Sequence, residues 1–313
     1  MDAPPSRRSR DLGILALATI APLWGYGWVV SKVALQYADP FTFAALLSGL
    51  GSACLFVLLA ATRRRLRPPS FVWVVLIGLL QTALFNGLAT LALTVGGAGQ
   101  VSVLVYTMPF WLLLLAWPVL GERLRGGQWP AVALALTGLV LVVRPWDIGG
   151  ALGGALACAA GLSWAGGSLL LKLLQRRGPQ ETLTLTAWQL GIGGLMLAAV
   201  AVLTHGGWPV WTGSFVACLL YCVLLANAVC WSLWNQALKW LPAGAAGLGT
   251  LAVPVLGVLA AWLQLGEAPS PLEGAGMTLI VAGLAVLAAA GLAAGRGGGA
   301  SAAPDPAPPP FID

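Results

Sequence analysis

Two apolar segments of this chain, residues 109–122 and 254–267, share one pattern and lie 145 positions apart. They read PFWLLLLAWPVLGE and PVLGVLAAWLQLGE, so both start with proline, carry Ala-Trp at the same place and end in Leu-Gly-Glu. Similarity at a fixed spacing is the signature of a repeated structural unit. The sequence therefore predicts two copies of one unit, each filling about half of the chain.

The composition indicates that lipid surrounds most of the fold. Hydrophobic residues make up 59% of the chain and charged residues only 8%, whereas a soluble domain carries roughly 25% charged residues. Too few charges remain to cover a surface that faces water. The net charge of +6 does not indicate a nucleic-acid partner, because the Lys and Arg residues lie in short clusters between apolar runs, as membrane topology signals do.

Ten apolar stretches can cross a bilayer as helices, which takes about 20 residues each. In chain order they are residues 12–35, 41–62, 71–93, 98–120, 128–143, 150–171, 182–204, 212–237, 243–265 and 272–294. They form two units of five, residues 12–143 and 150–294, between tails at 1–11 and 295–313. The predicted fold is an all-α integral membrane protein. The second tail is rich in Gly, Ala and Pro, so we expect it to be disordered.

The basic start of the chain followed by an apolar run also fits a cleaved signal peptide. However, the run at 12–35 is longer than the apolar core of such a peptide, and the matching run at 150–171 is internal. We therefore expect the first run to be retained as a membrane helix.

Positive charges predict the orientation. With the N-terminus in the cytoplasm, the inner segments hold all of the 16 Lys and Arg residues except Lys32, Arg144 and Lys172. The opposite orientation would violate the positive-inside rule. Both termini are therefore predicted to be cytoplasmic. Because five helices is an odd number, the second unit must enter the membrane inverted relative to the first.

Further equivalent residues support the repeat. Trp24, Gly27 and Lys32 in the first unit correspond to Trp164, Gly167 and Lys172 in the second, and Asn86 corresponds to Asn227. Inverted repeats about an axis in the membrane plane are typical of secondary transporters, which bind substrate near the midplane between the halves.

These features together resemble the EamA family of the drug/metabolite transporter superfamily. The resemblance rests on ten helices in two inverted repeats, the early Trp-Gly…Lys pattern and the Pro…Leu-Gly-Glu endings, and it covers roughly residues 12–294. Members are mostly inner-membrane exporters of amino acids and other small metabolites, including exporters of aromatic amino acids. Ala165 stands where the first unit has Gly25, a small departure that leaves the expected fold unchanged.

The resemblance implies that the first, third, fourth, sixth, eighth and ninth helices line a central cavity. Aromatic and polar residues at mid-helix depth on these helices are the candidate substrate-cavity residues: Trp24, Tyr26, Gln81, Asn86, Tyr106, Trp164, Tyr221 and Asn227. An amide in hydrocarbon needs a partner, so these side chains should face the bundle interior. Bonding between helices is the alternative role, worth ~0.6 kcal/mol per bond on average.

Three prolines lie within the predicted helices, at Pro22, Pro109 and Pro254. Each removes a backbone hydrogen bond and frees a carbonyl. They predict either static kinks or hinges that bend during gating, with Gly25 and Gly27 adding freedom beside Pro22.

Four charged residues are paired by the repeat. Lys32 and Lys172 lie inside helix spans, where they either extend to the membrane surface or have a structural or gating role at opposite faces. Glu122 and Glu267 follow helix ends, where the helix dipole is unfavourable for a carboxylate. We expect each glutamate to be stabilised by another helix N-terminus or a loop cation.

Groups that could couple transport to protons are absent from the predicted membrane interior. All ten acidic residues fall in tails, loops or helix ends, and the single histidine, His205, follows the seventh helix. Proton-driven carriers usually hold a titratable group inside the membrane, so we expect a facilitator or exchanger. The five cysteines lie in apolar spans without further ligands, so no metal site and no cofactor are expected.

The leading hypothesis is a secondary transporter that exports small metabolites, with amino acids as the first substrate class, from the cytoplasm across the inner membrane by alternating access. Drug or nucleotide-sugar transport is the alternative, although the latter would favour midplane cations for the phosphates. A channel and a scaffold without transport are further alternatives, whereas an enzyme would need a cluster of catalytic groups that one histidine and no buried pair of carboxylates do not supply. The expected partners are a small-molecule substrate and the lipid bilayer, with no nucleic acid and a monomer as the unit.

Overall fold

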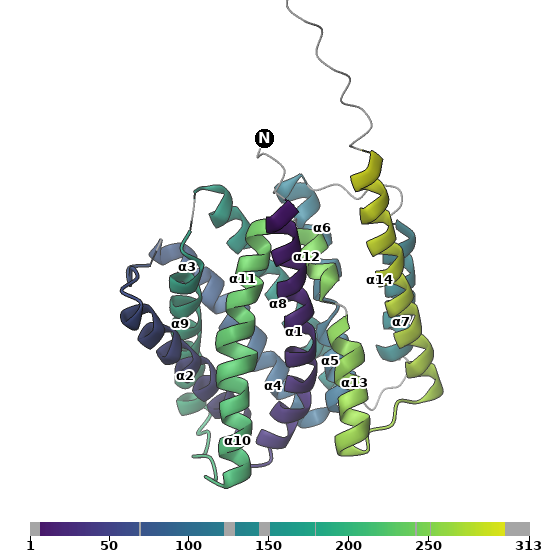
Figure 1. The fold of residues 1–313 in the computed structure, drawn as a ribbon. Coiled ribbons are helices and arrows are strands. Elements are labelled where there is room, and N and C mark those ends of the chain that lie inside the picture. The colour runs from purple at the N-terminus through teal and green to yellow at the C-terminus, as the bar shows by residue number, and fades with distance from the viewer. Residues whose placement is uncertain are drawn as a thin grey trace, which may run out of the picture.

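The computed structural model describes residues 7–68, 70–121, 129–143, 151–178, 180–241, 243–250 and 252–297. Regular structure in these ranges is entirely helical (Figure 1). The elements are α1 (Arg7–Ala34), α2 (Pro40–Ala61), α3 (Phe71–Ile77), η1 (Gly78–Leu84), α4 (Phe85–Val95), α5 (Ala98–Val105), α6 (Met108–Leu120), α7 (Trp129–Val143), α8 (Ala151–Arg176), α9 (Thr182–Leu203), α10 (Gly213–Tyr221), η4 (Cys222–Val229), α11 (Cys230–Trp240), α12 (Ala243–Gly249), α13 (Ala252–Leu265) and α14 (Pro271–Gly297).

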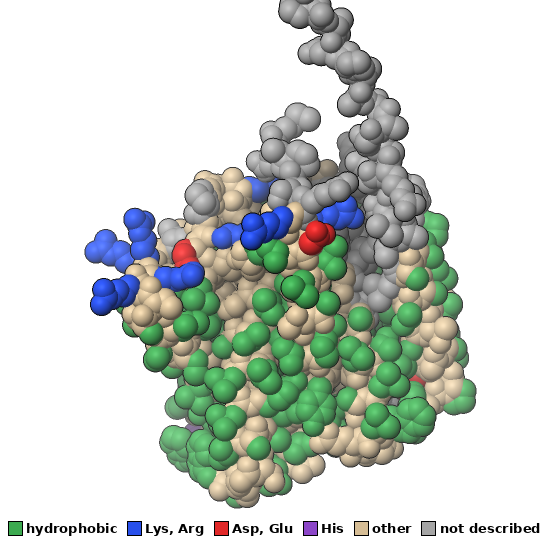
Figure 2. Space-filling model, viewed as in Figure 1, with side chains coloured by type: hydrophobic (Ala, Val, Ile, Leu, Met, Phe, Trp, Pro, Cys, Tyr) green, Lys and Arg blue, Asp and Glu red, His purple; other side chains and the backbone are tan. Residues whose placement is uncertain are grey.

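Seven helical segments in the described ranges are long and apolar enough to cross a membrane. They are Arg8–Ala34, Pro40–Ala61, Phe71–Val95, Ala98–Leu120, Leu152–Arg176, Thr182–Leu203 and Gly213–Trp240. Two shorter apolar helices cover Trp129–Leu141 and Ala252–Leu265. Figure 2 shows a broad hydrophobic surface below a row of Lys and Arg at one end of the molecule. The chain is a multi-pass membrane protein.

The first and last helices extend beyond the predicted spans. α1 begins at Arg7 rather than at residue 12, because residues 7–12 contain no proline or glycine that would break the helix. α14 continues to Gly297, past the predicted end at 294. Most of the tail predicted at 295–313, and residues 1–6 of the tail predicted at 1–11, lie outside the described residues. α1 starts and α14 ends at the same end of the bundle (Figure 1), which we name the basic end.

Four predicted spans are interrupted. The π-helical segments η1 and η4 lie at equivalent places in the two halves, each between two α-helices. The span at 98–120 breaks at Tyr106 and Thr107, and Pro109 then lies in the first turn of α6. Pro254 likewise lies in the first turn of α13, where a missing backbone N–H has no cost. Pro22 alone of the three predicted hinge prolines lies inside a continuous helix.

The two halves exchange equivalent contacts. α2 packs along α9 and α7 packs along α14, which are equivalent helices of the two halves. α1 packs against α13 and α11, just as α8 packs against α6 and α4. Figure 1 shows α7 and α14 together at one edge and α2 and α9 at the other, with α1 and α4 between them. Two copies related by a two-fold axis would make contacts of this kind.

Small residues allow α9 to approach η1 closely. A Cβ atom added at Gly193 would lie 2.6 Å from Thr82 Cγ2 and 2.8 Å from the Gly78 carbonyl oxygen. Neither distance is compatible with a real contact, so the crossing requires glycine at this position. Small residues have the same role at other helix contacts in membranes.

We therefore expect Gly193→Ala to destabilise the protein by about 1–3 kcal/mol through overpacking. The measurement is the loss of helical circular dichroism on heating in detergent. Gly213→Ala is the matched control, because a Cβ there meets no atom within 4 Å. Equal melting temperatures for the two variants would contradict the close contact between α9 and η1 at Gly193.

Glu181 connects the loop after α2 to the start of α9. Its side chain accepts hydrogen bonds from the Thr184 backbone N–H at 2.6 Å and from Arg64 at 2.9 Å. Partial burial opposes ionisation of Glu181, but the bonds from Thr184 and Arg64 outweigh that effect and lower its pKa. Asp39 caps α2 in the same way, accepting from the backbone N–H groups of Phe41 and Thr42.

The lowered pKa of Glu181 makes its contribution to stability depend on pH. The contribution is complete above the ordinary glutamate pKa of about 4.3 and is lost as pH falls through the lower folded-state value. Glu181→Gln should therefore lower the melting temperature at neutral pH, and its difference from wild type should shrink in acid. Asp11→Asn, at the exposed start of α1, is the control. A difference that does not change with pH would contradict this assignment.

Candidate functional site

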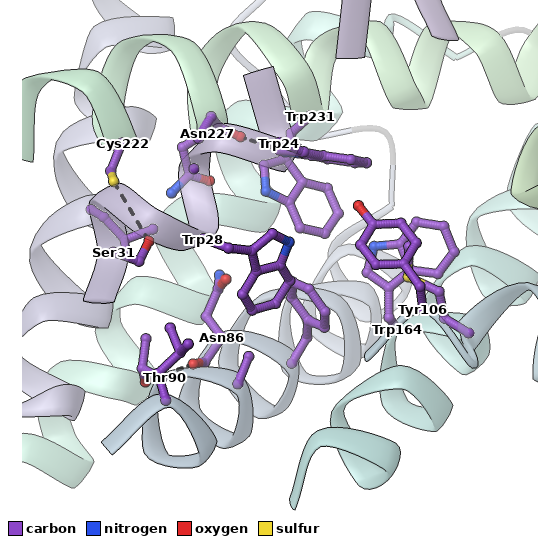
Figure 3. Close-up of a pocket in the computed structure, with 17 residues that line it drawn as sticks. Trp24, Trp28, Ser31, Asn86, Thr90, Tyr106, Trp164, Cys222, Asn227 and Trp231 are labelled. Atoms are coloured by element: carbon purple, nitrogen blue, oxygen red, sulfur yellow. Dashed lines mark hydrogen bonds between the residues drawn. The ribbon is translucent and has the colours of Figure 1, made fainter. Parts of the chain in front are cut away.

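A pocket lies inside the bundle, between helices of both halves. The centre of a water molecule can occupy a volume of about 90 Å³ inside this pocket. Because one water needs about 10–15 Å³ on this measure, the pocket has room for several waters or a small solute. Its lining residues are Trp24, Gly27, Trp28, Ser31, Leu47, Phe85, Asn86, Ala89, Thr90, Leu93, Tyr106, Met108, Trp164, Cys222, Ala226, Asn227 and Trp231 (Figure 3).

Aromatic rings form one part of the wall. Trp24 meets Trp231 edge to face with ring centroids 5.8 Å apart, and Phe85 meets Trp231 at 6.0 Å. Trp164 packs at 4.4 Å against Trp234, which is fully buried behind the lining. The Trp24 indole donates a 2.8 Å hydrogen bond to the Ala226 carbonyl of η4. The indole orientation is therefore fixed by backbone from the opposite half of the chain.

Neutral polar side chains form the other part of the pocket wall. Figure 3 shows Asn86 and Asn227 on one side of the pocket, with Trp164 and Tyr106 on the other. The Asn86 amide donates to Ser48 at 3.4 Å. Asn227 is only 2% exposed, and its Oδ1 has no hydrogen-bond partner among the described residues. A buried acceptor without a partner is costly, so Asn227 is the group best placed to bond to a solute.

Five of the eight candidate cavity residues line this pocket: Trp24, Asn86, Tyr106, Trp164 and Asn227. The other three lie elsewhere. Tyr26 is 39% exposed on the outer side of α1, edge to face with Tyr221, whose hydroxyl donates to the Leu23 carbonyl at 2.9 Å.

Gln81 is fully buried in a polar network between helices and does not line the pocket. It donates to Ser168 at 2.7 Å and accepts from Gln189 at 3.1 Å. Asn235 extends the network to Thr186 and Gln189. This is the helix-bonding role that the sequence left open for amides.

Sequence reasoning missed Trp28, Phe85 and Trp231 as lining residues. For two of these residues, the spacing along the helix could have predicted their place in the pocket. Trp28 follows Trp24 by four residues, and Trp231 follows Asn227 by four, so each pair shares a helix face. Phe85 directly precedes Asn86 and has no such signal, because its direction depends on the widened turns of η1.

The candidate hinge glycines have different surroundings. Gly27 lines the pocket. A Cβ at Gly25 would lie 2.8 Å from Leu256 Cβ and 3.1 Å from the Val253 carbonyl oxygen. Gly25 therefore allows α1 to pack against the start of α13, beside Pro254.

The repeat-paired lysines hold equivalent helix ends. Lys32 donates to the Gly96 carbonyl after α4 at 2.5 Å and lies 3.7 Å from Glu267. Lys172 donates to the Leu238 and Leu241 carbonyls at the end of α11, at 2.5 and 2.8 Å. Unpaired carbonyls at a helix end favour a cation.

The two lysines lie at opposite ends of the bundle. Leu241 lies beside Gly13 near the start of α1, whereas Lys32 lies near the end of α1. Glu267 also accepts from the Gly99 backbone N–H in the first turn of α5, at 3.5 Å. Glu122, its repeat partner, lies outside the described residues.

A double-mutant cycle tests the Lys32–Glu267 pair. The two side chains are 29% and 30% exposed, so we expect a coupling of about 0.2–1 kcal/mol between Lys32→Met and Glu267→Gln. Lys32→Met alone should cost more, about 1.5–3 kcal/mol, because it also removes the bond to Gly96. Lys172→Met, at the other end, should be additive with Glu267→Gln. Coupling in that second cycle would contradict the assignment.

The comparison with family models identifies the chain. The model described as the EamA-like transporter family matches twice, over residues 11–144 and 151–289. The chain belongs to the EamA-like transporter family. The resemblance inferred from the repeated motifs is therefore confirmed, and membership places the chain among membrane transporters.

Three similar proteins each cover more than half of the chain. It is 26% identical over 261 residues to the uncharacterized transporter YoaV of Bacillus subtilis, covering 81% of this chain and 89% of that protein. It is 29% identical over 290 residues to a probable amino-acid metabolite efflux pump of Salmonella typhimurium, covering 88% and 94%. A riboflavin transporter of Rhizobium johnstonii is 34% identical over 190 residues, covering 58% and 59%.

A solved crystal structure has the same fold. It superposes with a TM-score of 0.72 at 24% sequence identity, covering 93% of this chain and 99% of the other. At this level of identity the similarity concerns the fold alone.

Proposed function

We propose that this EamA protein is a secondary transporter that exports small metabolites, with amino acids as the leading substrate class, by alternating access through the pocket between its halves. The observation that carries the proposal is the pocket itself. It lies between helices from both halves, and aromatic rings and neutral amides line it. A site between two inverted repeats can open to either side in turn by equivalent motions.

The lining chemistry favours a small amphipathic solute. Indole faces contact apolar or planar groups, and Asn227 offers an unpaired acceptor. The side chains that line the pocket carry no formal charge within the described part of the chain. The names of two relatives, a probable amino-acid metabolite efflux pump and a riboflavin transporter, support solutes of this general kind.

The topology that we propose has ten membrane helices in two inverted sets of five, with both termini in the cytoplasm and the protein in the inner membrane. The exchanged helix contacts and the charges gathered at the basic end (Figure 2) support it. Cysteine labelling from either side of the membrane, at Arg10→Cys and Trp208→Cys, tests it. Reaction of both positions from the same side would contradict it.

We further propose that transport is downhill or by exchange. The described carboxylates lie at helix ends or in loops, at Asp11, Asp39, Glu181, Glu267 and Glu273, so no carboxylate among the described residues lines the pocket. In proteoliposomes, an imposed pH gradient should therefore not drive accumulation of solute against its own gradient. Accumulation would reject the facilitator mechanism.

Nucleotide sugars and larger drugs are the alternative substrates. A nucleotide sugar would need cations for its phosphates and more space than the pocket offers. A channel would show conductance, and a scaffold would show no solute flux. A panel of radiolabelled solutes in proteoliposomes, with amino acids tested first and riboflavin included, separates these possibilities.

Substitutions in the pocket should lower transport without unfolding the protein. Asn227→Ala removes an amide that we expect to bond to the solute, so counterflow of a transported solute should fall roughly five- to tenfold. Trp164→Ala should also lower it, but its indole is almost fully buried, so a melting curve must accompany that variant. Trp208→Ala, at an 86% exposed position, is the control. Unchanged counterflow in Asn227→Ala would remove that residue from the site.

A further inference from the structure

A second cavity lies at the basic end, between the end of α2, the start of α9 and α11. The centre of a water molecule can occupy a volume of about 690 Å³ in this cavity, compared with about 90 Å³ in the central pocket. None of its lining residues also lines the pocket. The two indoles that α11 directs into the bundle, Trp231 and Trp234, are 3% and 0% exposed and do not line it. This cavity is therefore a separate site.

The cavity is amphipathic. Leu58, Leu183 and Leu233 supply apolar side chains from three helices. Arg64 and Lys239 supply two cations. Leu58 lies one turn before the end of α2, whereas Arg64 follows that end. Apolar surface therefore continues toward the membrane centre and the cationic groups lie at the membrane edge.

The charge balance of the cavity is positive. One carboxylate, that of Glu181, lines it against the two cations. The bond from Arg64 to Glu181 uses one Nη1–H, and a guanidinium has five N–H donors. Lys239 is exposed in the last turn of α11. Arg63 and Arg65 flank Arg64 in the same loop and add positive potential.

At the other end of the bundle, the loop after α9 packs against the start of α2. There Asp39 caps α2 as Glu181 caps α9. The segment after α9 packs against it, since the Val210 N–H donates to the Tyr37 carbonyl at 2.8 Å. A Cβ at Gly206 would lie only 2.9 Å from Asp39 Oδ1.

We propose that this cavity binds an anionic phospholipid from the membrane leaflet at the basic end. The phosphate accepts hydrogen bonds from Arg64 and Lys239, and an acyl chain lies along Leu58, Leu183 and Leu233. Basic cavities between membrane helices suit lipid headgroups, and guanidinium and ammonium groups both bind phosphate. The site is independent of the transported solute.

Native mass spectrometry of the purified full chain in neutral detergent tests the proposal. The probes are phosphatidylglycerol, phosphatidylcholine and inorganic phosphate. Wild type should retain phosphatidylglycerol in preference to phosphatidylcholine. Lys239→Gln should weaken that retention about fivefold, the effect expected for one basic residue at an anionic surface. Arg67→Gln, an equal charge change outside the cavity, should change it less than about twofold.

Arg64→Gln also removes the bond to Glu181, so a melting curve must accompany it. Leu233→Gln should weaken retention of the lipid without changing the net charge. Equal losses in Lys239→Gln and Arg67→Gln would show general electrostatic attraction and overturn the site. Displacement of the lipid by inorganic phosphate at millimolar concentration would show a free-anion site and overturn the lipid assignment.

Discussion

The structure depends on satisfying backbone hydrogen bonds where no water is available. In lipid each unpaired N–H or C=O costs several kcal/mol, so irregular backbone is tolerated only where protein or a cavity covers it. The interruptions follow this rule. The turn at Tyr106, the end of η1 next to Phe85, and η4 at Ala226 all border the central pocket. Irregular backbone and the candidate site therefore coincide.

Polar side chains complete the packing that the helices begin. Gln81, Gln189 and Asn235 connect η1, α9 and α11 through amide bonds, while Lys32 and Lys172 bind carbonyls at helix ends. Each of these side chains bonds to a different helix or helix end. The bonds therefore fix the alignment of the helices, which apolar packing alone leaves less defined. Asn227 differs because its oxygen remains unpaired.

Much of the fold was predictable because hydrophobic length and repeat spacing act along the chain. Seven of the ten predicted spans coincide with helical segments that are long and apolar enough to cross a membrane. The Lys32–Lys172 equivalence indicated a shared role, and both side chains donate to carbonyls at helix ends. The direction of each side chain around its helix was less predictable. Tyr26 and Gln81 have the right depth for the pocket but face elsewhere. The π-helical turns of η1 and η4 shift the helix face, and the sequence carries no clear signal for them.

The indoles that surround the pocket have a practical consequence. Trp24, Trp28, Trp164 and Trp231 border one small space, and the Trp24 N–H is bonded to a carbonyl. A solute entering that space would displace water from several fluorophores at once. The unlabelled protein therefore contains its own optical sensor of occupancy, and emission spectra could rank ligands before any transport assay exists.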